Sequence, residues 1–166
     1  MALQGPGFDG GGRLKQMISL VDLPATLLDA CGVSAPEGMQ GRSFLPLTRG
    51  ETENRREAAY TEIWDAPYIK RAVRTQRWKY CIRRKEEGLN DLSTWEFAED
   101  ALYDLRADPY ELNNLAGFTS HRQVADVLKE RLLSNMREAG ESEPVIENAP
   151  EQHSGQKKVN EKEAYE

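Results

Sequence analysis

The residues best suited to chemistry lie in a strongly basic stretch between Tyr68 and Lys85. This stretch contains no acidic residue, and its eight cations are Lys70, Arg71, Arg74, Arg77, Lys79, Arg83, Arg84 and Lys85. Cations interleaved with aromatic rings such as Trp78 and Tyr80 can neutralise and stack on an anionic ligand. The same pattern fits a hairpin whose cations face solvent and protect a strand edge from aggregation. The residues alone leave both interpretations open.

The charge of the whole chain narrows the kind of anion. The 166 residues carry 22 basic and 28 acidic side chains, for a net charge of −6. A chain that is acidic outside the basic stretch disfavours nucleic acid as a partner, so a glycan or a small anion is the better candidate. No apolar run approaches the length of about 20 residues that a membrane-spanning helix needs. We therefore expect neither a nucleic-acid partner nor a membrane partner.

The cysteine and histidine residues do not form a recognisable catalytic or metal-binding pattern. Cys31 and Cys81 lie fifty residues apart, and neither His121 nor His153 has a Cys or a pair of carboxylates at ligand spacing. The glycines of residues 5–10 match a dinucleotide fingerprint in letters, but no strand precedes them and no helix follows. We therefore predict no catalytic residue and no metal site in this chain.

The first part of the chain reads as one strand and one helix. Leu14 to Val21 predicts a short buried strand, and Asp22 is placed to cap a helix that ends at Gly32. Residues 33–48 form a connection interrupted by Pro and Gly. This is a single strand-loop-helix unit of an α/β domain, and it lacks the neighbouring strands that a parallel sheet requires.

The second part of the chain changes to a β pattern followed by a helix. Strands are predicted over residues 59–64, 69–75, 77–84 and 101–105, and Trp78, Tyr80 and Ile82 share one face of the third. Ser120 and Gln123 form a capping-box pattern, and an apolar stripe then continues to Gly140. These elements predict an α+β fold with a small antiparallel sheet of about four strands packed against a C-terminal helix.

Residues 141–166 differ from the rest in composition. They hold seven Glu and three Lys, which gives −4 of the total charge of −6, and their few apolar residues follow no helical or strand period. Such a segment cannot bury enough apolar surface to offset the entropy of ordering it. We therefore predict a disordered acidic tail.

Three stretches, taken in series, resemble the C-terminal portion of a sulfatase. They are SLVDLPATLLDACG (19–32) followed by GMQGRSFLP (38–46), RAVRTQRWKY (71–80) and LYDLRADPYELNNL (102–115). Sulfatases are alkaline-phosphatase-like hydrolases that cleave sulfuric esters. The resemblance implies that residues 1–48 are a remnant of the catalytic α/β domain, that residues 49–140 form the C-terminal subdomain and that residues 141–166 follow as the tail.

The resemblance also implies what the chain lacks. The family's nucleophile lies in a Cys/Ser-x-Pro/Ala-x-Arg motif, whose Cys is oxidised to formylglycine, whereas Gly-Val-Ser-Ala follows Cys31 and Ile-Arg-Arg-Lys follows Cys81. The resemblance places formylglycine and a divalent metal, calcium by expectation, in an N-terminal part upstream of Gly5. We therefore expect a chain with no cofactor of its own and no sulfatase activity when it is alone.

A role at the edge of the active site is the remaining expectation. The family's C-terminal subdomain lies beside the active-site cleft, so the resemblance implies that Trp64, Tyr68, Arg71 or Arg74 holds the non-reacting part of a sulfated small molecule or glycan. The competing interpretation is that Arg74 pairs with a carboxylate such as Glu62 and orders the sheet. The alternative function is a stand-alone binding module with a basic hairpin for an anionic glycan or another anionic partner. The sequence indicates neither a cellular location nor an oligomeric state.

Overall fold

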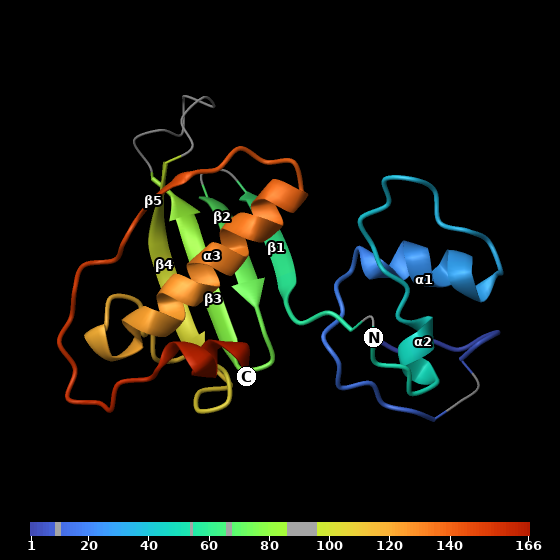
Figure 1. Ribbon diagram of the computed structural model, residues 1–166, viewed down its shortest axis with the longest axis horizontal. Coiled ribbons are helices and arrows are strands. Elements are labelled where there is room, and N and C mark those ends of the chain that lie inside the picture. The colour runs from blue at the N-terminus through green and yellow to red at the C-terminus, as the bar shows by residue number, and fades with distance from the viewer. Residues whose placement is uncertain (9–10, 54, 66–67, 86–95) are drawn as a thin grey trace. The chain divides into compact units, whose positions relative to one another are not determined.

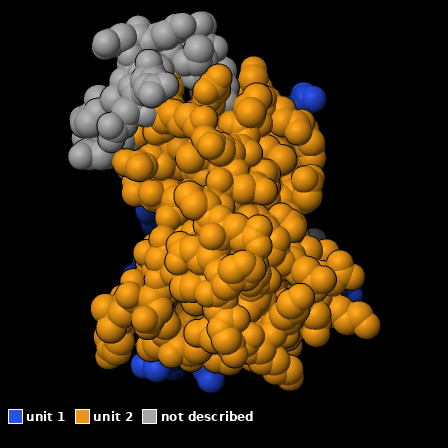
Figure 2. All heavy atoms as spheres, turned by 90° about the vertical axis from the view of Figure 1, so that its left-hand side faces the viewer, with its two compact units in different colours: residues 1–59 blue, residues 60–166 orange. Residues whose placement is uncertain are grey.

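The computed structural model describes residues 1–166 except 9–10, 54, 66–67 and 86–95, and leaves the side chains of residues 65 and 68 undescribed. The chain forms two compact units, Met1–Ala59 (unit 1) and Tyr60–Glu166 (unit 2), which Figure 2 distinguishes by colour. The division falls after Ala59, later than the boundary after residue 48 that the sequence indicated. None of the described helices is long and apolar enough to cross a membrane.

The described residues of unit 1 form two short helices, α1 (Asp22–Ala30) and α2 (Leu45–Thr48). The predicted strand over residues 14–21 is not formed, and Met17 makes only an isolated bridge with Arg56. An extended segment needs a neighbouring strand to satisfy its backbone groups, and the described part of unit 1 offers none beyond this bridge. The apolar run there was therefore a poor guide to local structure.

Asp22 organises unit 1, although not as the predicted helix cap. Val21 occupies the N-cap position of α1 and makes no side-chain cap hydrogen bond. The buried Asp22 carboxylate instead accepts hydrogen bonds from the backbone N–H groups of Ser19 at 2.8 Å and Arg42 at 2.9 Å, and from Arg56 Nε at 2.8 Å. Burial opposes ionisation, but these hydrogen bonds outweigh it and hold the pKa of Asp22 below its usual value.

Unit 2 is built on a five-stranded sheet in the order β1-β2-β3-β4-β5 (Figure 1). The strands are β1 (Ala59–Asp65), β2 (Tyr68–Arg74), β3 (Trp78–Arg84), β4 (Glu96–Asp104) and β5 (Val145–Glu147). The β2/β3 and β3/β4 pairs are antiparallel, whereas β5 joins β4 in parallel. The α+β prediction is confirmed, and β5 adds a strand that the sequence did not predict.

The core of unit 2 lies between the sheet and the helix α3 (Arg122–Glu138), which crosses one face of the sheet (Figure 1). The alternation predicted for β3 is confirmed, because Trp78, Tyr80 and Ile82 are all buried. The predicted apolar stripe of the helix is buried with no exposed surface at Val124, Leu128, Leu132 and Met136. Close packing of these two apolar faces supplies the hydrophobic stabilisation of the unit.

The two ends of α3 differ in how closely they follow the sequence signals. The short 3₁₀ helix η2 (Thr119–His121) precedes α3, and the predicted capping box is absent, because the Ser120 hydroxyl lies 2.8 Å from His121 Nδ1. At the other end Gly140 adopts φ +82°, and the N–H groups of Gly140 and Glu141 bond the carbonyls of Arg137 and Met136. This is a Schellman motif, which glycine at this position favours.

Residues 141–166 are ordered in the structure, in contrast to the predicted disordered tail. They contribute β5 and the 3₁₀ helix η3 (Glu161–Tyr165), in which Ala164 has no exposed surface. Trp78 Nε1 donates a hydrogen bond to the carbonyl of Glu163 at 2.7 Å, and Arg77 forms ion pairs with Glu163 and Glu166. These partners are far away in the sequence, so the local composition of the segment could not reveal them.

Candidate functional site

Within the described residues, at least six of the eight cations of the basic stretch form ion pairs with carboxylates from outside it. Ion pairs join Lys70 to Asp100, Arg71 to Glu62 and Glu141, Arg77 to Asp104, Lys79 to Glu111, Arg83 to Asp100 and Lys85 to Glu147. The acids come from β1, β4, the loop after β4 and the segment after α3. The hairpin of β2 and β3 therefore presents far less positive charge than its sequence indicates.

One group of side chains, which we name the Arg71 cluster, combines a buried cation with an exposed aromatic ring. It consists of Tyr60, Glu62, Trp64, Arg71 and Glu141. The Arg71 side chain is only 1% exposed, and its Nε and Nη2 donate to Glu141 Oε2 at 3.0 and 2.9 Å. Nη2 also lies 3.1 Å from Glu62 Oε1, and the Tyr60 hydroxyl donates to Glu141. The guanidinium is thus held by two carboxylates.

The positions of these residues follow from strand alternation and from the end of α3. Tyr60, Glu62 and Trp64 lie at every second position of β1 and so share one face. Glu141 follows the Schellman glycine directly, so the turn that ends α3 also aims its carboxylate at Arg71. Burial and the hydrogen bond to Glu141 raise the pKa of Tyr60, which keeps the hydroxyl protonated as a donor.

Trp64 is the most exposed side chain of this cluster, and Glu62 is also partly exposed. The surface of Trp64 is 57% exposed, and the Arg71 guanidinium carbon lies 5.9 Å from the ring centroid. A cation at this distance is attracted to the ring and restrains it. The arrangement gives an exposed flat apolar surface with a buried cation next to it.

The four predicted rim residues therefore have different surroundings. Trp64 and Arg71 lie together, whereas Arg74 is exposed at the end of β2 and forms no ion pair with any described residue. The side chain of Tyr68 is outside the described part of the structure. The expectation that Glu62 pairs with Arg74 is wrong, because Glu62 pairs with Arg71.

The two cysteines differ in exposure, and the potential metal ligands among the described residues are scattered. Cys81 is buried, and burial raises the pKa of its thiol to about 11, so the nucleophilic thiolate is scarce near neutral pH. Cys31 is exposed. Among the described residues, no group of three or more His, Cys, Asp or Glu side chains could hold a metal ion. The described side chains therefore do not fit a catalytic divalent metal.

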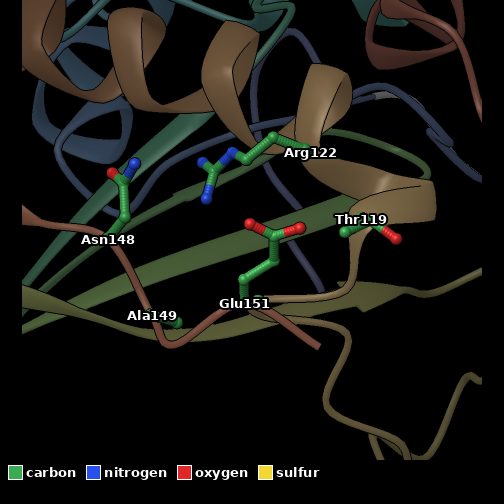
Figure 3. Close-up of a pocket in the computed structure, with 6 residues that line it drawn as sticks. Thr119, Arg122, Asn148, Ala149 and Glu151 are labelled. Carbon is green, nitrogen blue, oxygen red and sulfur yellow. The ribbon is translucent and has the colours of Figure 1, made fainter. Parts of the chain in front are cut away.

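Sequence reasoning missed a pocket beside the start of α3 (Figure 3). Its volume is about 330 Å³, and its lining residues are Gly117, Thr119, Arg122, Asn148, Ala149 and Glu151. One wall is the chain around η2, and the other is the segment after β5. The second wall belongs to residues predicted to be disordered, so no sequence signal pointed to this pocket.

Comparison with known proteins connects these features to a family. Residues 3–138 match the family model described as N-sulphoglucosamine sulphohydrolase, C-terminal. The chain belongs to this sulfatase family. The predicted resemblance to the C-terminal portion of a sulfatase is thereby confirmed.

Individual relatives agree with the family assignment. The chain is 30% identical to the N-acetylglucosamine-6-O-sulfatase of Bacteroides thetaiotaomicron over 141 residues, which cover 80% of this chain and 24% of the relative. It is 29% identical to human arylsulfatase K over 128 residues, which cover 70% of this chain and 22% of the relative. The chain therefore spans about a quarter of the length of these curated relatives.

A solved structure supports the fold. A protein solved in complex with its substrate D-glucosamine-2-N,6-O-disulfate superimposes with a TM-score of 0.61 at 27% sequence identity. The superposition covers 74% of this chain and 24% of that one. The α+β arrangement described above is thus the arrangement of sulfatase C-terminal domains.

Proposed function

We propose that this chain supplies the C-terminal subdomain of a sulfatase that hydrolyses a sulfated glycan or a sulfated small molecule. The observation that carries the proposal is the match of residues 3–138 to a C-terminal sulfatase family. One relative is named for an N-acetylglucosamine sulfate, and one similar structure holds a glucosamine disulfate. A sulfated amino sugar is therefore the substrate class that the comparisons support best.

The chemistry of the reaction is supplied by residues outside this chain. Hydrolysis of a sulfate ester needs a nucleophile and groups that stabilise charge on the leaving sulfate. The buried Cys81 thiol suits neither role, and the described residues hold no metal-binding cluster. The resemblance assigns these roles to formylglycine and a divalent metal, calcium by expectation. The chain alone is accordingly inactive.

The coding sequence upstream of residue 1 tests this assignment. The proposal predicts an open reading frame that continues upstream and encodes a Cys/Ser-x-Pro/Ala-x-Arg motif. If translation begins at Met1 in the organism and the chain accumulates at 166 residues, the proposal that it belongs to a longer catalytic polypeptide is wrong.

Within the complete enzyme, Trp64 and Arg74 hold the non-reacting part of the substrate. Trp64 offers an exposed ring backed by a cation, and Arg74 is exposed without an ion pair among the described residues. Arg71 acts through Trp64 as a positioning residue, because its guanidinium is buried and bound to two carboxylates. Contacts to the remote part of a substrate contribute binding energy that the reacting centre can use.

Steady-state kinetics of the complete enzyme test the rim assignment. Trp64→Ala and Arg74→Ala should each lower kcat/KM for a glycan substrate while changing it little for a small aryl sulfate, which lacks the remote part. Tyr110→Ala is the matched control, because Tyr110 is also an exposed aromatic residue. Equal losses of kcat/KM on both substrates, or an equal loss in the control variant, would show that Trp64 and Arg74 do not bind the remote part of the substrate.

The alternative of a stand-alone anion-binding module receives less support. Its basic hairpin is largely neutralised by ion pairs, so little cationic surface is available for an anionic partner. Binding of the chain to immobilised heparin should therefore be weak at low salt. Strong retention that falls steeply with added salt would favour the module instead.

A further inference from the structure

Hydrogen bonds within the chain connect the two walls of the pocket beside α3 and fix the distance between them. The buried Glu99 carboxylate joins them, because it accepts hydrogen bonds from Arg122 Nη1 at 2.7 Å and Nη2 at 2.6 Å on one side. It accepts another from the backbone N–H of Ala149 at 2.9 Å on the other side. Tyr80 adds a hydrogen bond from beneath at 3.0 Å. The walls are thus tied through one anchoring carboxylate.

Backbone contacts fix the same spacing a second time. Thr119 N–H donates to the carbonyl of Gln152 at 2.9 Å, and Gln152 N–H donates to the carbonyl of Gly117 at 2.8 Å. A Cβ atom at position 117 would lie 2.2 Å from the carbonyl oxygen of Pro150, and Gly117 has φ +83°. Only glycine allows this close approach, so a side chain there would push the second wall away. The pocket is therefore formed before any ligand arrives.

Several polar groups that line this space retain hydrogen-bonding capacity that the fold does not use. Figure 3 shows Arg122 and Glu151 reaching toward the pocket from opposite walls, with Thr119 and Asn148 beside them. Within the described residues, no protein group hydrogen-bonds the Thr119 hydroxyl or the Glu151 carboxylate. Asn148 uses its Oδ1 to accept from Lys129 at 3.0 Å, which leaves its amide protons available. Donors and acceptors thus converge on one small cavity.

The balance of charge selects the class of ligand. Arg122 is already neutralised by Glu99, and Glu151 adds a negative charge at the mouth, so an anionic group such as a sulfate is disfavoured. An uncharged ring with adjacent hydroxyls can donate to Glu151 and Thr119 while it accepts from Asn148 and Arg122. The volume of about 330 Å³ lies at the small end of ligand pockets.

We propose that this pocket binds an unsulfated sugar ring, as an accessory site on the C-terminal subdomain. The choice of a sugar among hydroxylated ligands rests on the proposed function of the chain. The geometry of the pocket is independent of that proposal. The second wall lies beyond residue 138, where the family match ends, so this wall is a feature of the chain outside the matched region.

Chemical-shift titration of the ¹⁵N-labelled chain with N-acetylglucosamine tests the proposal. We expect saturable shifts at the amides of Thr119, Asn148, Ala149 and Glu151, with an affinity in the millimolar range. Thr119→Val removes only a hydroxyl and should weaken binding about fivefold, and Glu151→Gln should weaken it about tenfold. Gln156→Ala, an exposed change in the same segment, should leave the affinity unchanged.

Three results would overturn the proposal. They are the absence of saturable shifts at these amides, an affinity unchanged in both pocket variants, and equal shifts with glycerol or inorganic sulfate. Each result concerns sugar binding by this chain and leaves the sulfatase assignment untouched, because that assignment is tested by catalysis. A functional sulfatase without sugar binding at this pocket would therefore refute the pocket alone.

Discussion

The two units of the chain are stabilised in different ways. Unit 2 buries a continuous apolar core in which Trp78, Ile82, Leu102 and Leu128 have no exposed surface. Unit 1 buries a smaller apolar set, Ala25, Phe44, Leu45 and Leu47, and depends in addition on the buried carboxylate of Asp22. A large core tolerates the loss of one polar contact, whereas a small unit with few buried apolar residues depends more strongly on one buried carboxylate. Variants in each unit can test this difference.

The largest effect is expected from Leu128→Ala, which creates a cavity in the core of unit 2. Truncation of a fully buried leucine typically costs about 2–5 kcal/mol. Hydrogen exchange should accelerate throughout residues 60–166 and stay unchanged in residues 1–59. Equal acceleration in both ranges would show that the two units unfold together, and the proposed difference in how they are stabilised would then be wrong.

A large effect confined to unit 1 is expected from Asp22→Ala. The substitution removes the carboxylate that accepts hydrogen bonds from Arg56 and from two backbone N–H groups, and breaking such a largely buried pair costs about 3 kcal/mol. Exchange should accelerate within residues 19–56 and remain slow in the sheet. Glu37→Ala, which changes an exposed carboxylate of the same unit, should have little effect. Comparable damage from both variants would contradict the central role of Asp22.

An intermediate effect is expected from Glu141→Gln in the Arg71 cluster. The change removes one of two carboxylates that hold a buried guanidinium, at a cost of about 2 kcal/mol in urea-induced unfolding. Glu143→Gln is the control, since its ion pair with Arg137 is exposed and should contribute less than about 0.5 kcal/mol. Similar midpoints for both variants would indicate that the cluster does not stabilise unit 2.

The smallest effect concerns pH and His121 in unit 2. Burial lowers the pKa of this imidazole, against an opposing attraction from Asp104. As the pH falls, His121 therefore binds a proton in the unfolded chain before it does so in the folded chain. The contribution of neutral His121 to the free energy of unfolding is complete above pH 6.5 and declines as the pH falls from 6.5 toward the pKa of the folded state. Arg77 and Glu163 also act on this ring. His121→Gln should abolish the decline in thermal stability between neutral pH and pH 5. An unchanged decline in this variant would show that another titrating group causes it.

The sequence predicted the parts of the fold that depend on local periodicity. The alternation of Trp78, Tyr80 and Ile82 and the stripe from Val124 to Met136 each mark one buried face, and both faces are buried as predicted. The strand predicted over residues 14–21 is not formed, because an apolar pattern does not indicate whether a neighbouring strand exists to pair with it. Strand pairing is decided by residues that are distant in the sequence.

The candidate site was less predictable because its contacts are distant. Arg71 was a predicted rim residue, yet its partner Glu141 is separated from it by seventy positions and lay in a segment expected to be disordered. The pocket was missed for the same reason, since Asn148, Ala149 and Glu151 form one of its walls. Composition correctly described this segment as acidic, but the acids serve as partners for the cations of the sheet.

Sulfate release from an aryl sulfate with added calcium is the most direct test of the central claim that the chain is a subdomain without the catalytic groups. We expect the purified chain to release sulfate no faster than buffer alone. Calcium-dependent turnover that disappears in Cys31→Ser or Cys81→Ser would contradict that claim, because the nucleophile would then lie within this chain.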